Sequence, residues 1–318
     1  MTAVALDDFL LRYAPGPRVP LSPALPSARA ALARATETLR AIPDAALPGP
    51  WSKWGPDGEV RYGFYRILES LETAELAASA AVRRATERVG VARSASGDLT
   101  SLTTAARWDL HGRLAVIDDG ILDTDPGGGE WNLRQTMAHV VSGQRGYGWY
   151  TAYWLAQGAA DANDLPLRVP DEELEGRGSL AEIRDRFDST VDGSTEVLGR
   201  LDEQALALGS RWMGNPVTIG FRIGRWSSHI REHTVQVDKT LAMIGWMPRE
   251  VDRLIGLIHA AYGRLEAAVY AVPTDVLEST EEDGRTPAVI VEDALASAEE
   301  VAAEVADIAL AGVAGAAS

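Results

Sequence analysis

The stretch Arg225-Trp226-Ser227-Ser228-His229-Ile230-Arg231-Glu232-His233-Thr234-Val235-Gln236 decides how the rest of the chain is interpreted. We interpret it as a helix, in which residues four apart lie on one face because the helix turns every 3.6 residues. His229 and His233 therefore project from the same face, one turn apart. Two imidazoles in this arrangement can bind one metal ion, and a catalytic zinc site typically has a third protein ligand and one open position. The question is whether the chain supplies that third ligand.

Composition limits the classes of partner. The 318 residues are 46% hydrophobic and 24% charged, enough for one large domain or two modest ones. The net charge of -16 predicts no nucleic acid partner and no binding to anionic membrane surfaces, since phosphate groups select basic patches. The chain has no cysteine, so it cannot form disulfides, thiolate zinc sites or a cysteine nucleophile. Any thiol in its chemistry must come from a substrate.

The N-terminus and the hydropathy pattern predict a cytoplasmic protein. The first residues lack the basic region of a signal peptide, and acids interrupt their short apolar run. No stretch approaches the roughly 20 apolar residues that a membrane helix needs. The absence of cysteine is compatible with a reducing compartment.

Helical patterns cover most of the chain, and we see no convincing strand; residues 217–223 are too short to assign. The fold class predicted is all-α, with an up-and-down four-helix bundle at its centre. Five prolines between residues 11 and 26 favour an extended arm rather than a helix. The expected units are a Pro-rich arm (1–26), an N-terminal helical pair (27–97), a metal-binding bundle (98–246) and a C-terminal helical pair (247–318). We hypothesise that the two pairs pack as a second four-helix bundle, with the metal bundle inserted between its halves.

His139 is the candidate for the third ligand. It lies on a helix that we expect to begin at Asn132, where Gln135 can complete a capping box. Facing helices in a bundle bring such side chains to a shared point in the core. We therefore predict a divalent metal ion bound by His139, His229 and His233.

The residues around the histidines suggest a substrate pocket. Beyond His139 the same helix carries Ser142, Gly143 and Gly146, and a glycine within a helix costs about 1 kcal/mol relative to alanine. Room beside the metal would explain these glycines, although close helix packing would as well. Four aromatic residues are candidates for the pocket walls, namely Trp149, Tyr150, Tyr153 and Trp226. By default they would belong to the core.

Two polar residues on the histidine helix are candidates for orienting a substrate. Arg225 lies one turn before His229 and could bind a carboxylate with two parallel hydrogen bonds, and Gln236 lies one turn beyond His233. The alternative for Arg225 is an ion pair with Glu130 or Glu232.

A second interpretation of the histidine pair is the inverted zinc-protease pattern H-x-x-E-H. Glu232 would then be the general base, and a downstream acid such as Glu299, Glu300 or Glu304 would be the third ligand. This interpretation leaves His139 without a role, so we favour the three-histidine site.

The segment Glu130-Trp131-Asn132-Leu133-Arg134-Gln135-Thr136-Met137-Ala138-His139 resembles the second helix of the DinB/YfiT-like metalloenzymes. His229-x-x-x-His233-x-x-Gln236 is similar to the last helix of that family. The resemblance covers residues 98–246. It implies a four-helix bundle with a zinc or nickel ion on His139, His229 and His233, and it implies homodimers in many relatives.

The resemblance also indicates the chemistry to expect. Characterised relatives include thiol-dependent S-transferases and isomerases, so we expect a metal-dependent transferase that uses a low-molecular-weight thiol and a small-molecule substrate. Zinc is the expected ion, nickel the alternative, and isomerisation or hydrolysis the variant reactions. A non-catalytic binding or scaffold bundle, stabilised by the metal, is the competing hypothesis. The helices at both ends of the chain depart from the family pattern.

Overall fold

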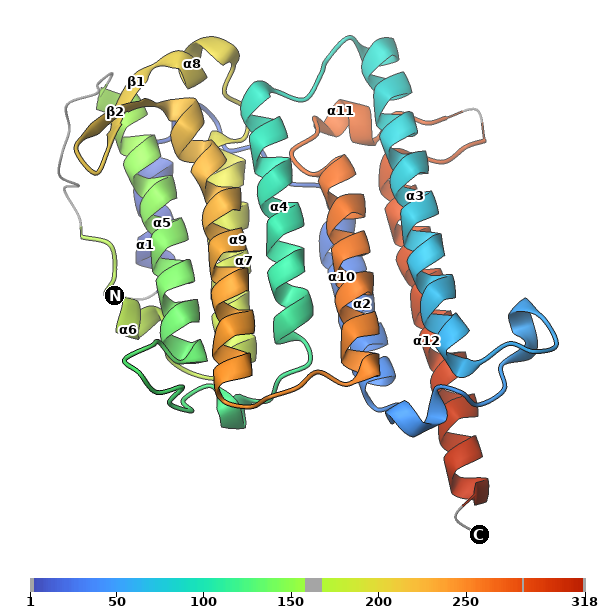
Figure 1. Ribbon diagram of the computed structural model, residues 1–318. Coiled ribbons are helices and arrows are strands. Elements are labelled where there is room, and N and C mark those ends of the chain that lie inside the picture. The colour runs from blue at the N-terminus through green and yellow to red at the C-terminus, as the bar shows by residue number, and fades with distance from the viewer. Residues whose placement is uncertain (1–2, 158–167, 282, 317–318) are drawn as a thin grey trace.

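The computed structural model describes residues 3–157, 168–281 and 283–316, and it consists almost entirely of helices, as the predicted all-α class requires (Figure 1). The elements are α1 (Ala3–Arg12), α2 (Ala24–Arg40), α3 (Val60–Val89), α4 (Ala95–Leu114), α5 (Leu133–Gln157), α6 (Glu172–Glu175), α7 (Leu180–Leu198), α8 (Glu203–Ala207), β1 (Gly209–Trp212), β2 (Asn215–Thr218), α9 (Ile219–Met243), α10 (Glu250–Val269), α11 (Thr274–Leu277) and α12 (Pro287–Ala316). Three short 3-10 turns lie at Asp44–Ala46, Ser52–Trp54 and Asp119–Ile121.

The long helices form two layers (Figure 1). The front layer runs α5, α9, α4, α10, α3 across the molecule, and α7, α2 and α12 lie behind it. Helix α4 packs against α9 on one side and α10 on the other, so the front layer is continuous. We call α4, α5, α7 and α9 the metal bundle, and α2, α3, α10 and α12 the terminal bundle.

The terminal bundle buries one continuous apolar core. Helix α12 packs along α2 and α3, and α3 also packs along α10. Side chains from all four helices share this core, with Leu32, Leu71, Leu265 and Val305 no more than 1% exposed. Because α2 and α3 precede the metal bundle in sequence while α10 and α12 follow it, the two halves of this core come from opposite ends of the chain.

Two helices of the metal bundle begin with a capping box, and the box at the start of α5 is the one predicted from Asn132 and Gln135. Asn132 Oδ1 accepts from the Gln135 amide at 2.9 Å, and Gln135 Oε1 accepts from the Asn132 amide at 3.0 Å. Ser179 and Glu182 form the equivalent capping box at the start of α7.

The four helices of the metal bundle do not simply alternate in direction. Helices α5 and α7 run parallel, as shown by two contacts in the same order along both helices. Gly176, just before α7, lies against Ala138, and Gly148 lies against Ser194 further along. The long connection between α5 and α7 permits this arrangement, whereas a short loop would require antiparallel neighbours.

A buried ionic cluster joins the two bundles. The Arg107 guanidinium on α4 is fully buried and donates to Glu266 on α10 and to Asp192 on α7 at 2.5 and 2.8 Å. Arg29 on α2 donates to the same two carboxylates. Both carboxylates therefore receive charged hydrogen bonds from each bundle, and the cluster fixes how the bundles meet.

Besides the up-and-down order of the metal bundle, the structure corrects the predictions of an extended N-terminal arm and of a chain without strands. Residues 3–12 form α1, which packs on α5 and α7, and α2 begins at Ala24 rather than at Ser27. Pro26 is compatible with this start because the first turn of a helix needs no donor there. Strands β1 and β2 form an antiparallel hairpin with Trp212 opposite Asn215. Its tight turn, Met213-Gly214, has φ values of 48° and 83°, as a two-residue hairpin loop requires.

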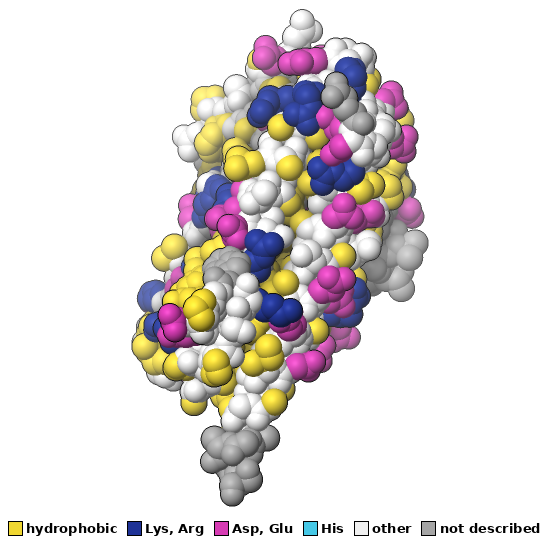
Figure 2. Space-filling model, turned by 90° about the vertical axis from the view of Figure 1, so that its right-hand side faces the viewer, with side chains coloured by type: hydrophobic (Ala, Val, Ile, Leu, Met, Phe, Trp, Pro, Cys, Tyr) yellow, Lys and Arg dark blue, Asp and Glu magenta, His cyan; other side chains and the backbone are white. Residues whose placement is uncertain are grey.

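The outer face of the terminal bundle carries charges of both signs (Figure 2). Acidic and basic side chains are interspersed with hydrophobic ones over the visible surface, and cross-helix ion pairs such as Arg264–Glu72 hold neighbouring helices. None of the helices in the described part of the chain combines the length and apolarity needed to cross a lipid bilayer.

Candidate metal centre and adjoining cavity

The three predicted histidine ligands come together in the middle of the metal bundle. His139 lies two turns into α5, and His229 and His233 lie one turn apart on α9, which packs antiparallel to α5. The Nε2 atom of His229 lies 3.3 Å from that of His139 and 3.0 Å from that of His233. One nitrogen from each ring can be chosen so that all three lie within 4.8 Å of one another.

Two of the imidazoles are oriented from behind by acceptors. His139 Nδ1 lies 2.8 Å from Glu172 Oε1, and His233 Nδ1 lies 2.7 Å from Gln236 Oε1. A carboxylate and an amide oxygen only accept hydrogen bonds, so both rings hold their proton on Nδ1. Their Nε2 lone pairs then face the shared point, which is how a histidine is prepared for a metal ion.

Gly143 explains how the His229 ring fits between the helices. A Cβ atom at this position would lie 2.8 Å from His229 Cε1, closer than real side chains approach. The imidazole itself is 4% exposed. Burial, followed by the charges of His233 and His139, lowers the pKa of His229 to about 3, so the ring is neutral and its lone pair is available at neutral pH. Burial also lowers the pKa of His233.

The donor set fits a divalent ion. Zinc binds imidazole nitrogen at about 2.0–2.1 Å, and a tetrahedral arrangement then spaces the nitrogens by about 3.3 Å. The two Nε2 separations of 3.3 and 3.0 Å are close to that spacing. The three histidines could therefore hold one metal ion.

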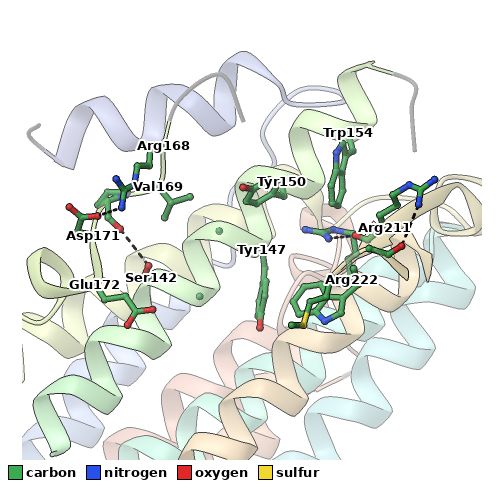
Figure 3. Close-up of a pocket in the computed structure, with 16 residues that line it drawn as sticks. Ser142, Tyr147, Tyr150, Trp154, Arg168, Val169, Asp171, Glu172, Arg211 and Arg222 are labelled. Atoms are coloured by element: carbon green, nitrogen blue, oxygen red, sulfur yellow. Dashed lines mark hydrogen bonds and ion pairs between the residues drawn. The ribbon is translucent and has the colours of Figure 1, made fainter. Parts of the chain in front are cut away.

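A cavity of about 770 Å³ adjoins the histidines and extends to the hairpin, which forms part of its wall (Figure 3). Its volume is in the range of small-molecule sites. Gly143 and Glu172, which touch His229 and His139, belong to its wall at one end. The opposite end is formed by Trp154 on α5, Arg222 on α9 and the hairpin residue Trp212.

Tyr147 connects the two ends of the cavity. Its ring centroid lies 5.1 Å from that of His229 and 5.1 Å from that of Trp212. Burial raises the pKa of Tyr147 to about 12, so its hydroxyl stays protonated and can donate a hydrogen bond to a bound molecule. It projects into the cavity from α5 (Figure 3).

The predicted substrate-orienting residues occupy different positions from those expected. Arg225 donates to both oxygens of Glu232 at 2.8 and 2.5 Å, so the alternative of an ion pair describes its position in this structure. Gln236 supports His233 rather than the cavity. Since Glu232 is held by Arg225, and Glu299 pairs with Arg34 in the terminal bundle, the protease-like set of acids does not assemble.

The predicted aromatic walls divide between cavity and core. Tyr150 lines the cavity. Trp149 and Trp226 are fully buried in the core, which corrects their assignment to the pocket. Trp149 stacks on Phe9 of α1 at 4.5 Å between ring centroids, and Tyr153 contacts Tyr13. The sequence predicts no helix at the N-terminus. It therefore gives no sign that α1 covers the side of α5 that carries Trp149.

Three features of the site lie outside the predicted set of site residues. Glu172 follows Pro170 in a polar segment, and only its proximity in space relates it to His139. Arg222 is on the histidine face of α9, seven residues before His229, and this spacing could have identified it. The hairpin has the strand residues Val217 and Thr218 and the turn glycine Gly214, a weak pattern that could have suggested a turn.

Comparisons with known proteins support the central bundle. The family model described as the DinB superfamily matches residues 102–237, a range that contains all three histidines. A comparison with curated proteins found no match, and a comparison with solved structures found none either. The bundle formed by α4, α5, α7 and α9, which holds the three histidines, belongs to the DinB superfamily.

Proposed function

We propose that this protein is a metal-dependent enzyme that activates a low-molecular-weight thiol, whose sulfur then forms a bond to a carbon of a small-molecule electrophile as a leaving group departs from that carbon. The observation that carries the proposal is the convergence of three imidazole Nε2 atoms beside a cavity of about 770 Å³. Zinc is the ion we propose first, since three imidazoles and an open position are characteristic of catalytic zinc. Nickel is the alternative.

The residues of the chain have distinct roles in this proposal. His139, His229 and His233 would hold the ion, and Glu172 and Gln236 keep two of these rings in the required tautomer. A bound divalent ion lowers the pKa of a coordinated thiol and so supplies thiolate near neutral pH. Tyr147 can donate a hydrogen bond to the electrophile, and Tyr150 and Trp212 offer apolar ring surface beside it.

The cavity favours an enzyme over the scaffold hypothesis. A metal ion that only stabilised the bundle would need no empty volume beside it. Gly146 enlarges that volume further, because a Cβ atom there would meet only Val169 Cγ2, at 3.9 Å. In a helix interior such a glycine lowers stability, which a scaffold has no reason to accept.

Metal analysis of the purified protein tests the first part of the proposal. After expression with zinc or nickel supplied, the wild type should carry about one ion per chain, and His139→Ala and His233→Ala should lose it. Circular dichroism should show both variants still helical, since His139 and His233 are only partly buried. A wild-type protein without stoichiometric metal would refute the proposal.

Thiol transfer is tested with 1-chloro-2,4-dinitrobenzene as the electrophile and cysteine, glutathione or mycothiol as the thiol. The metal-loaded wild type should accelerate conjugation with at least one of them, and His139→Ala should not. If the protein binds the ion but does not accelerate conjugation with any of these thiols, the scaffold hypothesis is the better description.

A further inference from the structure

Arg222 lies at the far end of the cavity and has no acidic partner among the described residues. It is 3% exposed. Its Nε donates to Thr151 Oγ1 at 3.3 Å and its Nη1 donates to the Arg211 carbonyl at 2.9 Å, so both partners are neutral. The guanidinium lies 3.8 Å from the centroid of the Trp154 ring (Figure 3). Burial lowers the pKa of Arg222 to about 9, so it still carries its charge at neutral pH.

The other buried arginines in the described part of the chain have carboxylate partners. Arg107 donates to Glu266 and Asp192, and Arg145 donates to Glu175 at 2.6 Å. This pairing is expected, because a charge removed from water costs free energy unless another charge compensates it. Arg222 is buried to the same degree without that compensation.

The position of Arg222 relative to the histidines defines the length of a possible ligand. Seven residues separate it from His229 on α9, so the two lie on one face of the helix and about 10 Å apart along its axis. The Tyr147 ring lies between them. The acids of the cavity wall, Asp171 and Glu172, are bonded to Arg168 and His139, so they do not compete for Arg222.

We propose that Arg222 binds the carboxylate of an organic acid whose apolar or aromatic body extends toward the histidines. The planar guanidinium matches a carboxylate with two parallel hydrogen bonds, which an ammonium group cannot do. Tyr147 and Trp212 line the cavity between Arg222 and the histidines and offer ring surface to the body of the ligand. The inference deepens the proposed function, on which it rests only for what happens at the histidine end.

Matched pairs of acids and amides test this inference by calorimetry. The probes are benzoate, trans-cinnamate and 4-phenylbutyrate, each beside its own amide. At least one acid should bind the metal-loaded wild type about tenfold more tightly than its amide. Arg222→Met should reduce the acid to the affinity of the amide and leave the amide unchanged. The control Arg168→Gln removes an exposed arginine of the same cavity and should change neither affinity by more than about twofold.

Two outcomes would overturn the inference. One is that no acid binds more tightly than its amide; the other is that Arg222→Met retains the preference. If Arg222→Met does not fold, Arg222→Lys keeps the charge but loses the planar fork, and it should still weaken the acid selectively. Metal content measured on the same samples separates the two proposals: a metal-free protein that prefers acids contradicts only the enzyme, and a metal-loaded protein without the preference contradicts only Arg222.

Discussion

The two bundles are built from the same number of long helices, yet their interiors differ. The terminal bundle has one unbroken apolar core, whereas the core of the metal bundle is divided into two separate clusters. Both bundles contain buried polar atoms without a partner, but in the metal bundle the whole Gln144 amide and the Ser194 hydroxyl are unbonded among the described residues, whereas the buried His259 of the terminal bundle still bonds Thr36 through Nε2. A site needs polar groups and empty volume, and both reduce the cohesion of a core. The described residues of the terminal bundle contain no comparable group of metal-ligating side chains, so this bundle can be packed for stability.

A substitution in the ionic cluster between the bundles should have the largest effect on the free energy of unfolding. Glu266→Ala leaves Arg29 and Arg107 to share Asp192, with Asp188 as a more distant second partner of Arg107 at 3.5 Å. Breaking a buried ion pair by removing one partner costs about 3–5 kcal/mol. Urea unfolding followed by circular dichroism should show a loss of that order in the free energy of unfolding.

The matched control for Glu266→Ala is Glu72→Ala. Glu72, on α3, forms an exposed ion pair with Arg264, which lies on α10 like Glu266. Exposed pairs contribute about 0–1 kcal/mol. Equal losses in the two variants would mean that the bundles are not held together by the buried cluster.

Gly143→Ala should affect the metal bundle specifically. The new Cβ must displace the His229 ring. Loss of a hydrogen-bond partner that orients a metal ligand lowers metal affinity by about 10–100-fold, and displacing the ligand itself should cost at least as much. We therefore expect zinc affinity to fall by about a hundredfold. Competition with a chelating dye measures this affinity. Gly146→Ala, three residues along the same helix, should leave zinc affinity unchanged and stabilise the fold by up to about 1 kcal/mol. If both variants bind zinc as the wild type does, Gly143 serves only helix packing.

Glu172→Ala should have a smaller effect on the same affinity. It removes the acceptor that orients His139, and the loss of such partners reduces metal affinity by about 10–100-fold. The neighbouring Glu173→Ala removes a well-exposed carboxylate of the same short helix and should change nothing. A wild-type affinity in Glu172→Ala would show that the His139 ring is held by packing alone.

Acid should gradually lower the stability that the fold gains from Asp188, which lies beside the ionic cluster between the bundles. Burial opposes ionisation of Asp188, but the neighbouring His111 and Arg107 lower its pKa to about 2. The unfolded chain, with an aspartate pKa of about 3.9, then binds more protons between these values. Stability should therefore fall as the pH falls from about 4 to 2, in urea titrations at several pH values. Asp188→Asn should flatten this slope; an unchanged slope would assign the acid sensitivity to other carboxylates.

The long helices and the three histidines could be predicted from the sequence because both follow from local periodicity. Helix ends at Asn132 and Ser179 are set by side chains three residues apart, and the i and i+4 spacing places His229 beside His233 whatever the rest of the fold does. His139 needed the additional assumption that its helix faces theirs.

The remainder depended on contacts between segments that are distant in the sequence. Arg225 is nearer to His229 in the sequence than Arg222 is, but Glu232 engages Arg225, and the hairpin and Trp154 enclose Arg222. Trp149 became a core residue because α1 covers it. Neither the course of α1 nor that of the hairpin is contained in the pattern of α5 and α9.

The divided origin of the terminal bundle has a consequence during synthesis. About 160 residues separate the end of α3 from the start of α10, and a ribosome adds roughly 5–20 residues per second. Helices α2 and α3 therefore leave the ribosome roughly 8–30 s before the helices that cover their apolar faces. The metal bundle, which is continuous in the chain, can fold during this interval. Nascent chains stalled once α9 has left the ribosome, with α10 still inside it, should accordingly bind chaperones through α2 and α3, and on the proposed function their histidines should already bind metal.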